Sequence, residues 1–145
     1  MSIYKKEFEL RWSDVDANQH VTHSSYYELG AHCRMSYFLE QGFTADWFRS
    51  SDIGVILFRE ECVFRRELNA GEKVSVNMLL TRCRKDASRW SVRHEILKDD
   101  GSLAAVINAD LAWMHAGQRK LTVPPSKIQA CLNELPKSQD FQWEE

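Results

Sequence analysis

The 145-residue sequence lacks closely spaced cysteines, long hydrophobic runs and internal repeats. Its four cysteines are widely separated and form no C-x-x-C pair, which argues against a zinc site and against a dense disulfide scaffold. This cysteine usage is typical of a reducing compartment, so we expect a cytoplasmic protein. No apolar segment approaches the roughly 20 residues of a membrane-spanning helix, and the start of the chain, MSIYKKEFEL, contains no apolar region of a signal peptide. We therefore expect no association with a membrane.

An excess of positive charge is absent as well. The chain carries 19 Lys and Arg against 21 Asp and Glu, and its formal net charge is −2. This balance argues against a general nucleic-acid-binding protein, and no DNA-binding module is evident. The hydrophobic share of 43% and the charged share of 28% are ordinary for a globular protein. A chain of this length can bury a substantial core, so we expect a single domain over residues 1–145. We expect no cofactor.

Polar side chains gather between Arg11 and His23. Those that can take part in chemistry are Asp14, Asp16, Asn18, His20 and His23. His20 and His23 have the spacing H-x-x-H, but no third ligand is evident, and we expect no metal site. Taken singly, Asp16 is more readily explained as a loop or capping acid, and Asn18 as a turn former. The combination Asp-x-Asn-x-His is uncommon in a loop of purely structural role, so we interpret it as a candidate site.

The residues after this stretch predict the longest helix of the chain. Polar residues recur at every fourth position on one face, and a largely apolar set, which Arg34 interrupts, occupies the opposite face. The polar set is Glu28, His32, Ser36 and Glu40, and the apolar set is Tyr26, Gly30, Cys33 and Tyr37. Ser24 or Ser25 can act as the N-cap, and Gly42 is typical of the residue that follows a helix. His23 is therefore expected at the helix mouth, where free N–H groups and the helix dipole favour negative charge.

From Ile53 onward the sequence changes to β-strand character. Alternating or β-rich segments are separated by turn signals near Gly71, Ala87 and Gly101. We expect strands over residues 3–12, 53–68 and 73–84, a strand that contains Trp90 and Ile96, and a strand over residues 103–115. Residues 45–51 predict a short helix or lid, Pro124-Pro125 precedes a short final helix, and residues 138–145 predict a frayed tail. One long helix followed by antiparallel strands predicts an α+β fold in which the helix packs across a curled sheet.

Two segments resemble motifs of one enzyme superfamily. The stretch DVDANQHVTHSSYY, residues 14–27, resembles the opening motif of the hotdog-fold thioesterases. It is similar to the acyl-thioesterase pattern Asp-x-Asn-x-His-Val, which a tyrosine follows, and to the motif of the 4-hydroxybenzoyl-CoA thioesterases. The stretch FRRELNAGEKV, residues 64–74, resembles the strand–turn segment F-x-R-E-x-x-x-G-[DE] of these enzymes. The resemblance covers roughly residues 3–130 and implies the hotdog fold, a long central helix wrapped by a curled antiparallel sheet.

The resemblance implies a thioesterase that hydrolyses an acyl-CoA or acyl-carrier-protein substrate. Asp16 matches the catalytic acid, and Asn18 and His20 match polar active-site positions of the plant acyl-carrier-protein members. Glu67 matches an acid near the site. Hotdog thioesterases build this site between two subunits, so the resemblance implies a homodimer or homotetramer in which Glu67 approaches Asp16 from the partner chain. The plant members place a cysteine after the acid, whereas this chain has Leu68, so a cysteine role does not transfer.

The remaining candidate residues would bind the substrate. Hydrolysis of a thioester needs a base, donors for the oxyanion and a held carrier. We expect backbone N–H groups at or near His23 to act as the oxyanion donors, and Tyr27, within the resembling motif, to contact the substrate. Arg84, Lys85 and Arg89 flank one turn and are candidates for holding the carrier's phosphates, although a solvated hairpin tip explains them equally well.

Two other functions stay open at this stage. Hotdog hydratases resemble this chain but carry Asp-x-Asn-Pro-x-His, with a histidine five residues after the aspartate. Here Gln19 replaces the proline and His20 follows Asp16 by four residues, so hydration is a secondary hypothesis. The other alternative is a non-catalytic protein that binds acyl-CoA without releasing thiol. The sequence does not determine the acyl group, the choice between CoA and acyl-carrier protein, or the choice between dimer and tetramer.

Overall fold

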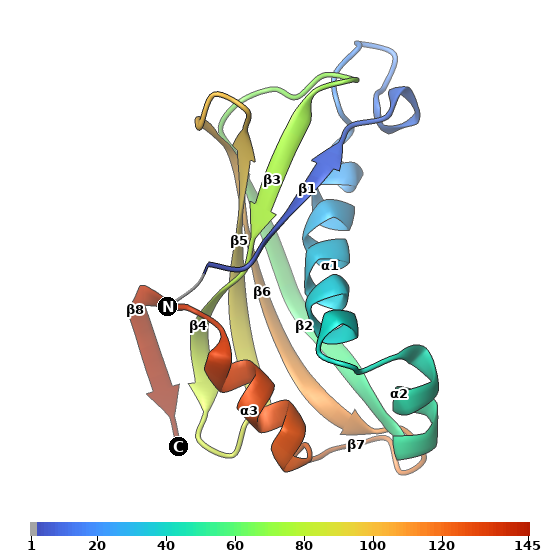
Figure 1. Cartoon of the computed structure of the whole chain (residues 1–145), viewed down its shortest axis with the longest axis vertical. Helices are drawn as coiled ribbons and strands as arrows, with labels where there is room; N and C mark the ends of the chain where they lie inside the picture. Colours follow the sequence, from blue (N-terminus) through green and yellow to red (C-terminus); the bar gives the residue numbers. More distant parts are fainter. Residues whose placement is uncertain (1–2) are drawn as a thin grey trace.

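The computed structural model describes residues 3–145, which form a largely antiparallel sheet curved around one long helix (Figure 1). The helices are α1 (His23–Glu40), α2 (Ala45–Ser51) and α3 (Ser126–Glu134), and a 3₁₀ turn, η1 (Trp12–Asp14), precedes α1. The strands are β1 (Lys5–Glu9), β2 (Ile53–Phe64), β3 (Lys73–Asn77), β4 (Leu79–Arg84), β5 (Arg89–Lys98), β6 (Leu103–His115), β7 (Lys120–Leu121) and β8 (Lys137–Glu144). This order confirms the predicted α+β fold. Within residues 3–145, no helix is long and apolar enough to cross a membrane.

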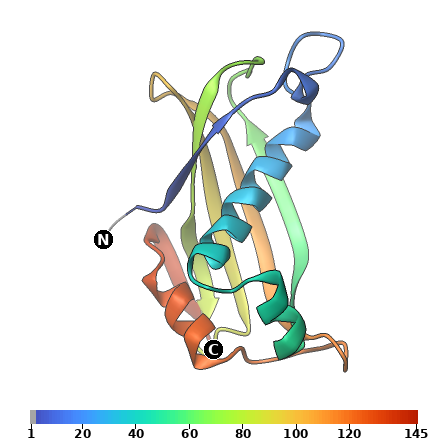
Figure 2. The ribbon, with the colours of Figure 1, turned by 45° about the vertical axis from the view of Figure 1, so that its right-hand side comes forward.

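Helix α1 lies against the face of the sheet that curls around it, as two views of the ribbon show (Figures 1 and 2). It begins before both predicted cap serines, because Thr22, with an extended backbone, is the N-cap. Thr22 makes no side-chain capping bond, and its C=O accepts the N–H of Ser25 at 3.0 Å. At the other end, Gly42 adopts a left-handed φ of +95° just after the helix, as its position in the sequence predicts.

Contacts along α1 fix how closely it approaches the sheet. A Cβ atom at Gly30 would lie 3.1 Å from Ile107 Cδ1 and 3.2 Å from His94 Cδ2, so a larger residue would force these side chains of β5 and β6 to shift by a few tenths of an ångström. Farther along, the Phe38 ring packs edge-on against Trp90 and Trp113, with centroid distances of 5.7 and 5.5 Å. Together these contacts anchor the helix over the middle of the sheet, so its N-terminus projects toward one end.

Strand β5 is central in the sheet. It pairs with β3 and β4 on one side and with β6 on the other, while β1 pairs with β3 and, among the strands of residues 3–145, β2 pairs with β6 alone. The predicted strand over residues 73–84 is in fact two strands, β3 and β4. The side chain of Asn77 explains the interruption, because its Oδ1 accepts the N–H of Glu95 at 2.7 Å and its Nδ2 donates to Glu95 Oε1 at 2.7 Å. A side-chain amide thus takes the place of a regular backbone pairing there.

The C-terminal segment differs most from the sequence prediction. The frayed tail predicted over residues 138–145 is wrong, because Lys137–Glu144 forms β8 and pairs in parallel with β4. Two ion pairs accompany this backbone pairing: Arg82 to Glu144 at 3.2 Å and Arg93 to Asp140 at 3.2 Å. The predicted strands over residues 3–12 and 53–68 are shorter than expected, since β1 covers Lys5–Glu9 and β2 ends at Phe64.

Candidate active site

The loop before α1 is a compact turn built around Asp16. A β-bridge between Val15 and Val21 closes the loop, and the N–H of Asp16 donates to the C=O of His20 at 2.9 Å. The carboxylate oxygen Oδ1 of Asp16 accepts the N–H groups of Asn18 at 2.8 Å and of His20 at 3.4 Å. Asp16 therefore has the structural role of a turn-forming acid. It is also exposed, and these bonds leave its Oδ2 free within residues 3–145.

The other acid of this loop, Asp14, is occupied. Its carboxylate accepts the backbone N–H of Arg11 at 2.9 Å and pairs with the Arg11 guanidinium at 3.0 Å. These bonds hold the pKa of Asp14 below its usual value. Of the two acids, Asp16 is thus the one without an arginine partner.

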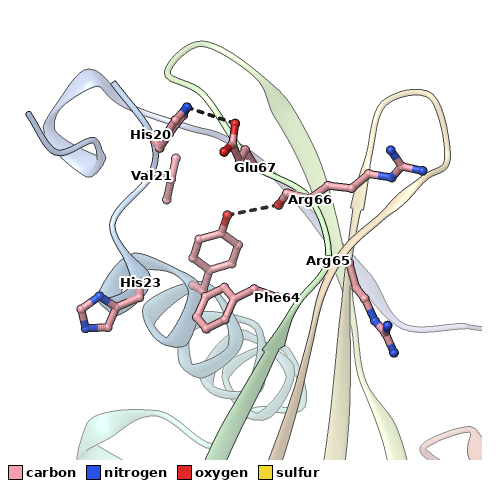
Figure 3. Close-up of a pocket in the computed structure, with 8 residues that line it drawn as sticks. His20, Val21, His23, Phe64, Arg65, Arg66 and Glu67 are labelled. Carbon is pink, nitrogen blue, oxygen red and sulfur yellow. Dashed lines mark hydrogen bonds and ion pairs between the residues drawn. The ribbon is translucent and has the colours of Figure 1, made fainter. Parts of the chain in front are cut away.

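Three contacts dock the loop and the first turn of α1 onto the segment that follows β2. The N–H of Val21 donates to the C=O of Leu68 at 2.9 Å, and the Tyr26 hydroxyl donates to the C=O of Arg66 at 3.4 Å. His20 Nε2 lies 3.0 Å from Glu67 Oε2 (Figure 3). The resemblance implied that Glu67 reaches the site from a partner chain. Within one chain, Glu67 already reaches the motif loop through His20, and its approach to Asp16 from a partner chain stays a prediction.

A cavity of about 340 Å³ lies where these elements meet (Figure 3). It is lined by His20, Val21, His23, Tyr26, Phe64, Arg65, Arg66 and Glu67. One side is aromatic, because Tyr26 packs edge-on against Phe64 at a centroid distance of 4.9 Å. Phe64 remains 49% exposed, which leaves an apolar surface free for a ligand. The cavity therefore combines an apolar wall with a polar rim that carries the His20–Glu67 pair.

The N-terminus of α1 adds hydrogen-bond donors to this region. The first N–H groups of an α-helix have no intrahelical acceptor, and Thr22 makes no side-chain capping bond that would satisfy them. The N–H groups of His23 and Ser24 are therefore available to an oxygen atom of a ligand. His23 itself lines the cavity. The helix dipole of the 18-residue α1 favours negative charge at the same point.

The structure brings some of the predicted site residues together and separates others. Asp16, Asn18 and His20 share one loop, although only His20 of these lines the cavity. Tyr27 is half-buried on α1 and lies outside the cavity lining, where Tyr26 takes part instead. The three basic residues of the turn between β4 and β5 (Arg84, Lys85, Arg89) lie at the opposite end of the sheet from the motif loop (Figure 1).

Sequence reasoning missed two features near the site. The first is the cavity wall formed by Phe64, Arg65 and Arg66, although the segment FRRELNAGEKV contains them. The second is a buried polar cluster under α1. Arg34 Nη2 donates to Glu60 Oε2 at 3.4 Å, and Arg34 Nη1 lies 3.1 Å from His94 Nε2. The break that Arg34 makes in the apolar helix face was the available signal for this cluster.

The four cysteines are free thiols with raised pKa values. Burial raises the pKa of Cys33 to about 12 and the pKa of each of the other three, Cys62, Cys83 and Cys131, to about 11. A thiol with such a pKa is a poor nucleophile at neutral pH. Within residues 3–145, no group of three His, Cys, Asp or Glu side chains gathers as a metal site would require.

Comparison with known proteins identifies the family. The family model of the thioesterase-like superfamily matches residues 10–132, which is most of the chain. The chain belongs to the thioesterase-like superfamily. The matched residues include both segments that resemble hotdog thioesterase motifs and all strands from β2 to β7. A search of curated protein sequences found no match.

Solved structures of other proteins, CoA thioesterases among them, have the same fold. A 1,4-dihydroxy-2-naphthoyl-CoA thioesterase from Synechocystis, Slr0204, is 18% identical, with a TM-score of 0.83 over 92% of this chain and 98% of that one. The SAV2348 protein of Staphylococcus aureus, solved in complex with CoA, is 16% identical, with a TM-score of 0.84 over 99% of this chain and 90% of that one. A gentisyl-coenzyme A thioesterase, BH1999, is 20% identical, with a TM-score of 0.77 over 88% of this chain and 98% of that one. At these identities the likeness establishes the hotdog fold.

Proposed function

We propose that this protein is a thioesterase that hydrolyses an acyl-CoA or acyl-carrier-protein thioester to a free acid and a thiol. The observation that carries the proposal is the meeting of the Asp16 loop, the N-terminus of α1 and Glu67 around one cavity. Membership of the thioesterase-like superfamily supports the same reaction class. The CoA complex and the aryl-CoA thioesterases among the structural neighbours support a CoA thioester as the substrate.

In the proposed reaction, Asp16 activates the attacking water. Its exposed carboxylate is fixed through Oδ1 to the loop backbone, and Oδ2 is free to accept a proton from water. The water oxygen forms a bond to the acyl carbon, the C–S bond breaks, and the proton passes to the leaving thiolate sulfur. Asn18 and His20 supply a polar setting that can position this water.

Backbone N–H groups at the mouth of α1 would stabilise the oxyanion. The carbonyl oxygen gains negative charge as water attacks, and N–H donors that are already fixed in place lower the energy of this state. The N–H of His23 has no helical acceptor and belongs to a residue that lines the cavity. Removing a donor of this kind typically costs about 10²–10³-fold in kcat.

A second route, in which the Asp16 carboxylate attacks the carbonyl itself, gives a mixed anhydride. A single turnover in ¹⁸O-labelled water separates the two routes. Direct attack by water puts the label only in the released acid. Hydrolysis of an anhydride at the Asp16 carbonyl puts the label in Asp16. We favour direct attack because Asn18 and His20 provide a polar setting for a bound water.

Assembly and compartment are part of the same proposal. We propose a homodimer or homotetramer, because β2 pairs only with β6 in the part of the chain that the structure describes, which leaves a long strand edge open. The four free thiols suit the reducing cytoplasm.

The experiment that tests this function is a thiol-release screen. Acyl-CoA substrates of increasing chain length, together with aryl and hydroxylated acyl groups, are incubated with the protein, and free CoA thiol is followed over time. The proposal expects release of thiol and acid in equal amounts. Addition of water to an enoyl-CoA without thiol release would support a hydratase instead. Acyl-CoA binding with no release would support a non-catalytic binding protein.

A further inference from the structure

Arg65 and Arg66 stand at the end of β2 with a fixed backbone. The N–H groups of both residues donate to the C=O of Ala104, at 2.8 and 3.0 Å. The C=O of Arg66 accepts the Tyr26 hydroxyl at 3.4 Å. The main chain of this arginine pair is thus part of the cavity wall, held from both the sheet and α1. Both side chains are exposed.

The two guanidinium groups leave the cavity on its outer side. In Figure 3 they point away from His20 and His23, beyond the wall that their own backbone forms. Neither guanidinium makes an ion pair with a carboxylate of residues 3–145. The pKa of Asp100 is lowered mainly by the bond that its carboxylate accepts from the Ser102 hydroxyl at 2.6 Å, and only to a small degree by the charge of Arg66. Two positive charges that are not ion-paired within residues 3–145 therefore lie just outside the cavity.

The basic residues at the other end of the sheet, Arg84, Lys85 and Arg89, each contact another side chain. Lys85 pairs with Glu145 at 2.9 Å, and the Arg89 guanidinium lies over the Phe58 ring at 5.0 Å. Arg84 Nη1 lies 3.4 Å from the Ser88 hydroxyl oxygen. In one chain, these groups are remote from the cavity (Figure 1).

Charge outside the cavity is where a phosphopantetheine carrier needs it. The thioester lies at one end of the pantetheine arm and the phosphates lie at the other, so a thioester inside the cavity leaves its phosphates outside. A guanidinium group matches the geometry of phosphate oxygens and can bond two of them at once. Resting on the proposed function, we infer that Arg65 and Arg66 hold the phosphate groups of the carrier while the acyl group occupies the cavity.

The test compares two thioesters of the same acyl group. One is the acyl-CoA, and the other is the acyl-N-acetylcysteamine thioester, which has the same reacting bond but no phosphate. In the variant Arg65→Gln/Arg66→Gln, the KM for acyl-CoA should rise by about tenfold or more, since hydrogen bonds to charged groups are worth that much. Its kcat, and its KM for the phosphate-free thioester, should stay unchanged. The increase in KM should shrink at high salt.

A matched control removes two positive charges elsewhere. Arg49→Gln/Lys127→Gln changes exposed residues of α2 and α3, at the other end of the molecule, and should leave the KM for acyl-CoA unchanged. The variant Arg84→Gln/Lys85→Gln tests the rival phosphate site. An acyl-carrier-protein thioester of the same acyl group shows which carrier the arginines serve.

The outcomes separate this inference from the proposed function. An unchanged KM for acyl-CoA in the Arg65→Gln/Arg66→Gln variant, or an equal rise for both thioesters, would overturn the inference while hydrolysis stands. A rise in KM only in the Arg84→Gln/Lys85→Gln variant would transfer the role to that turn. If no thioester is hydrolysed, the proposed function fails, and calorimetry with CoA alone still tests the arginines. Tighter binding of CoA by the wild type than by the variant supports them, and equal binding overturns them.

Discussion

His20 Nε2 and Glu67 Oε2 lie 3.0 Å apart, and this contact joins the motif loop to the segment after β2. Glu67 is 72% exposed at its side chain, so it gains little from burial by making the contact. The backbone bond from Val21 to Leu68 already holds the two segments together. An exposed pair of this kind contributes little to stability, so we expect its effect to be local, on the orientation of the His20 ring at the cavity.

We predict that Glu67→Ala lowers kcat because the His20 ring loses its fixed orientation. A misplaced active-site group costs up to about 10²-fold in rate. Glu67→Gln should lose less, because its side-chain carbonyl oxygen can still accept a bond from His20. Glu7→Gln, an exposed carboxylate on β1, is the control and should behave as the wild type. Equal kcat in Glu67→Ala and the wild type would show that the pair has no part in turnover.

We predict that turnover needs no cysteine. The raised pKa values leave all four thiols protonated at neutral pH, so none supplies a thiolate. Cys62→Ser, the change at the cysteine that is only half-buried, should keep kcat within about twofold of the wild type. The variant with all four cysteines changed to serine should lose stability, since Cys33, Cys83 and Cys131 are buried, but it should keep activity where it folds. A trapped acyl adduct on any cysteine, together with inactivity of a folded variant, would contradict this prediction.

We predict a dimer in which β2 pairs with β2 of a second copy. Antiparallel pairing centred on Glu60 places Arg59 opposite Glu61 of the partner subunit, twice over by symmetry. Exposed apolar side chains along the same strand, Leu57 at 46% and Val63 at 41%, would gain cover from this pairing. Arg59→Glu replaces two attractions by repulsions and should raise the dissociation constant by about tenfold.

The double change Arg59→Glu/Glu61→Arg should restore the dimer, because it exchanges the two charges across the same register. Light scattering and sedimentation over a range of concentrations measure this rescue. A stable monomer at micromolar concentration with full activity would refute the dimer. A dimer indifferent to both variants would refute the register.

We predict that part of the stability depends on pH through His94. Burial and the nearby charge of Arg34 lower the pKa of His94 to about 3, so the folded protein keeps this imidazole neutral. Its Nδ1 lies 2.8 Å from the C=O of Asn77, which makes Nδ1–H the donor and leaves Nε2 to accept from Arg34. In the unfolded chain the imidazole titrates near pH ~6.5 and binds a proton that the folded state does not. Its contribution to stability is therefore complete above pH ~6.5 and falls as the pH decreases toward 3.

The measurement is urea unfolding of the wild type and of His94→Gln at pH 7 and pH 4. A glutamine side chain can donate a hydrogen bond from its amide nitrogen and accept one at its amide oxygen, as neutral His94 does with its two ring nitrogens, but it does not titrate. We expect the wild type to lose more stability than the variant between these two pH values. Parallel losses would show that His94 is not the group responsible.

The sequence predicted the fold because its local signals agree with the tertiary structure. Alternating apolar residues and turn residues such as Gly101 located the long strands, and periodicity located α1. The prediction from sequence failed for β8, because the segment KSQDFQWE has little apolar alternation. This strand depends on a backbone partner, β4, that is distant in the sequence. The prediction also failed at Asn77, where a side-chain amide interrupts what the alternation of Val74 and Val76 extends as one strand.

The candidate site was predicted only in part for a similar reason. The loop around Asp16 is local, so the spacing of its residues was enough to single it out. The resemblance placed Glu67 near the site, but its contact with His20 and the cavity wall at Phe64 join segments far apart in the chain, which only the fold brings together. Arg34 was visible as a charge on an apolar face, but its partners Glu60 and His94 come from two different strands.

The central claim is that Asp16 carries the hydrolysis, and Asp16→Asn tests it most directly. Asparagine keeps the Oδ1 atom that accepts the N–H groups of Asn18 and His20, so the loop is preserved while the basic carboxylate is lost. The measurement is the rate of thiol release from the best acyl-CoA substrate by the wild type and by the variant, with both shown to unfold at similar urea concentration. We expect kcat to fall by about 10²–10⁴-fold with little change in stability. Turnover equal to that of the wild type in a folded Asp16→Asn protein would contradict the account.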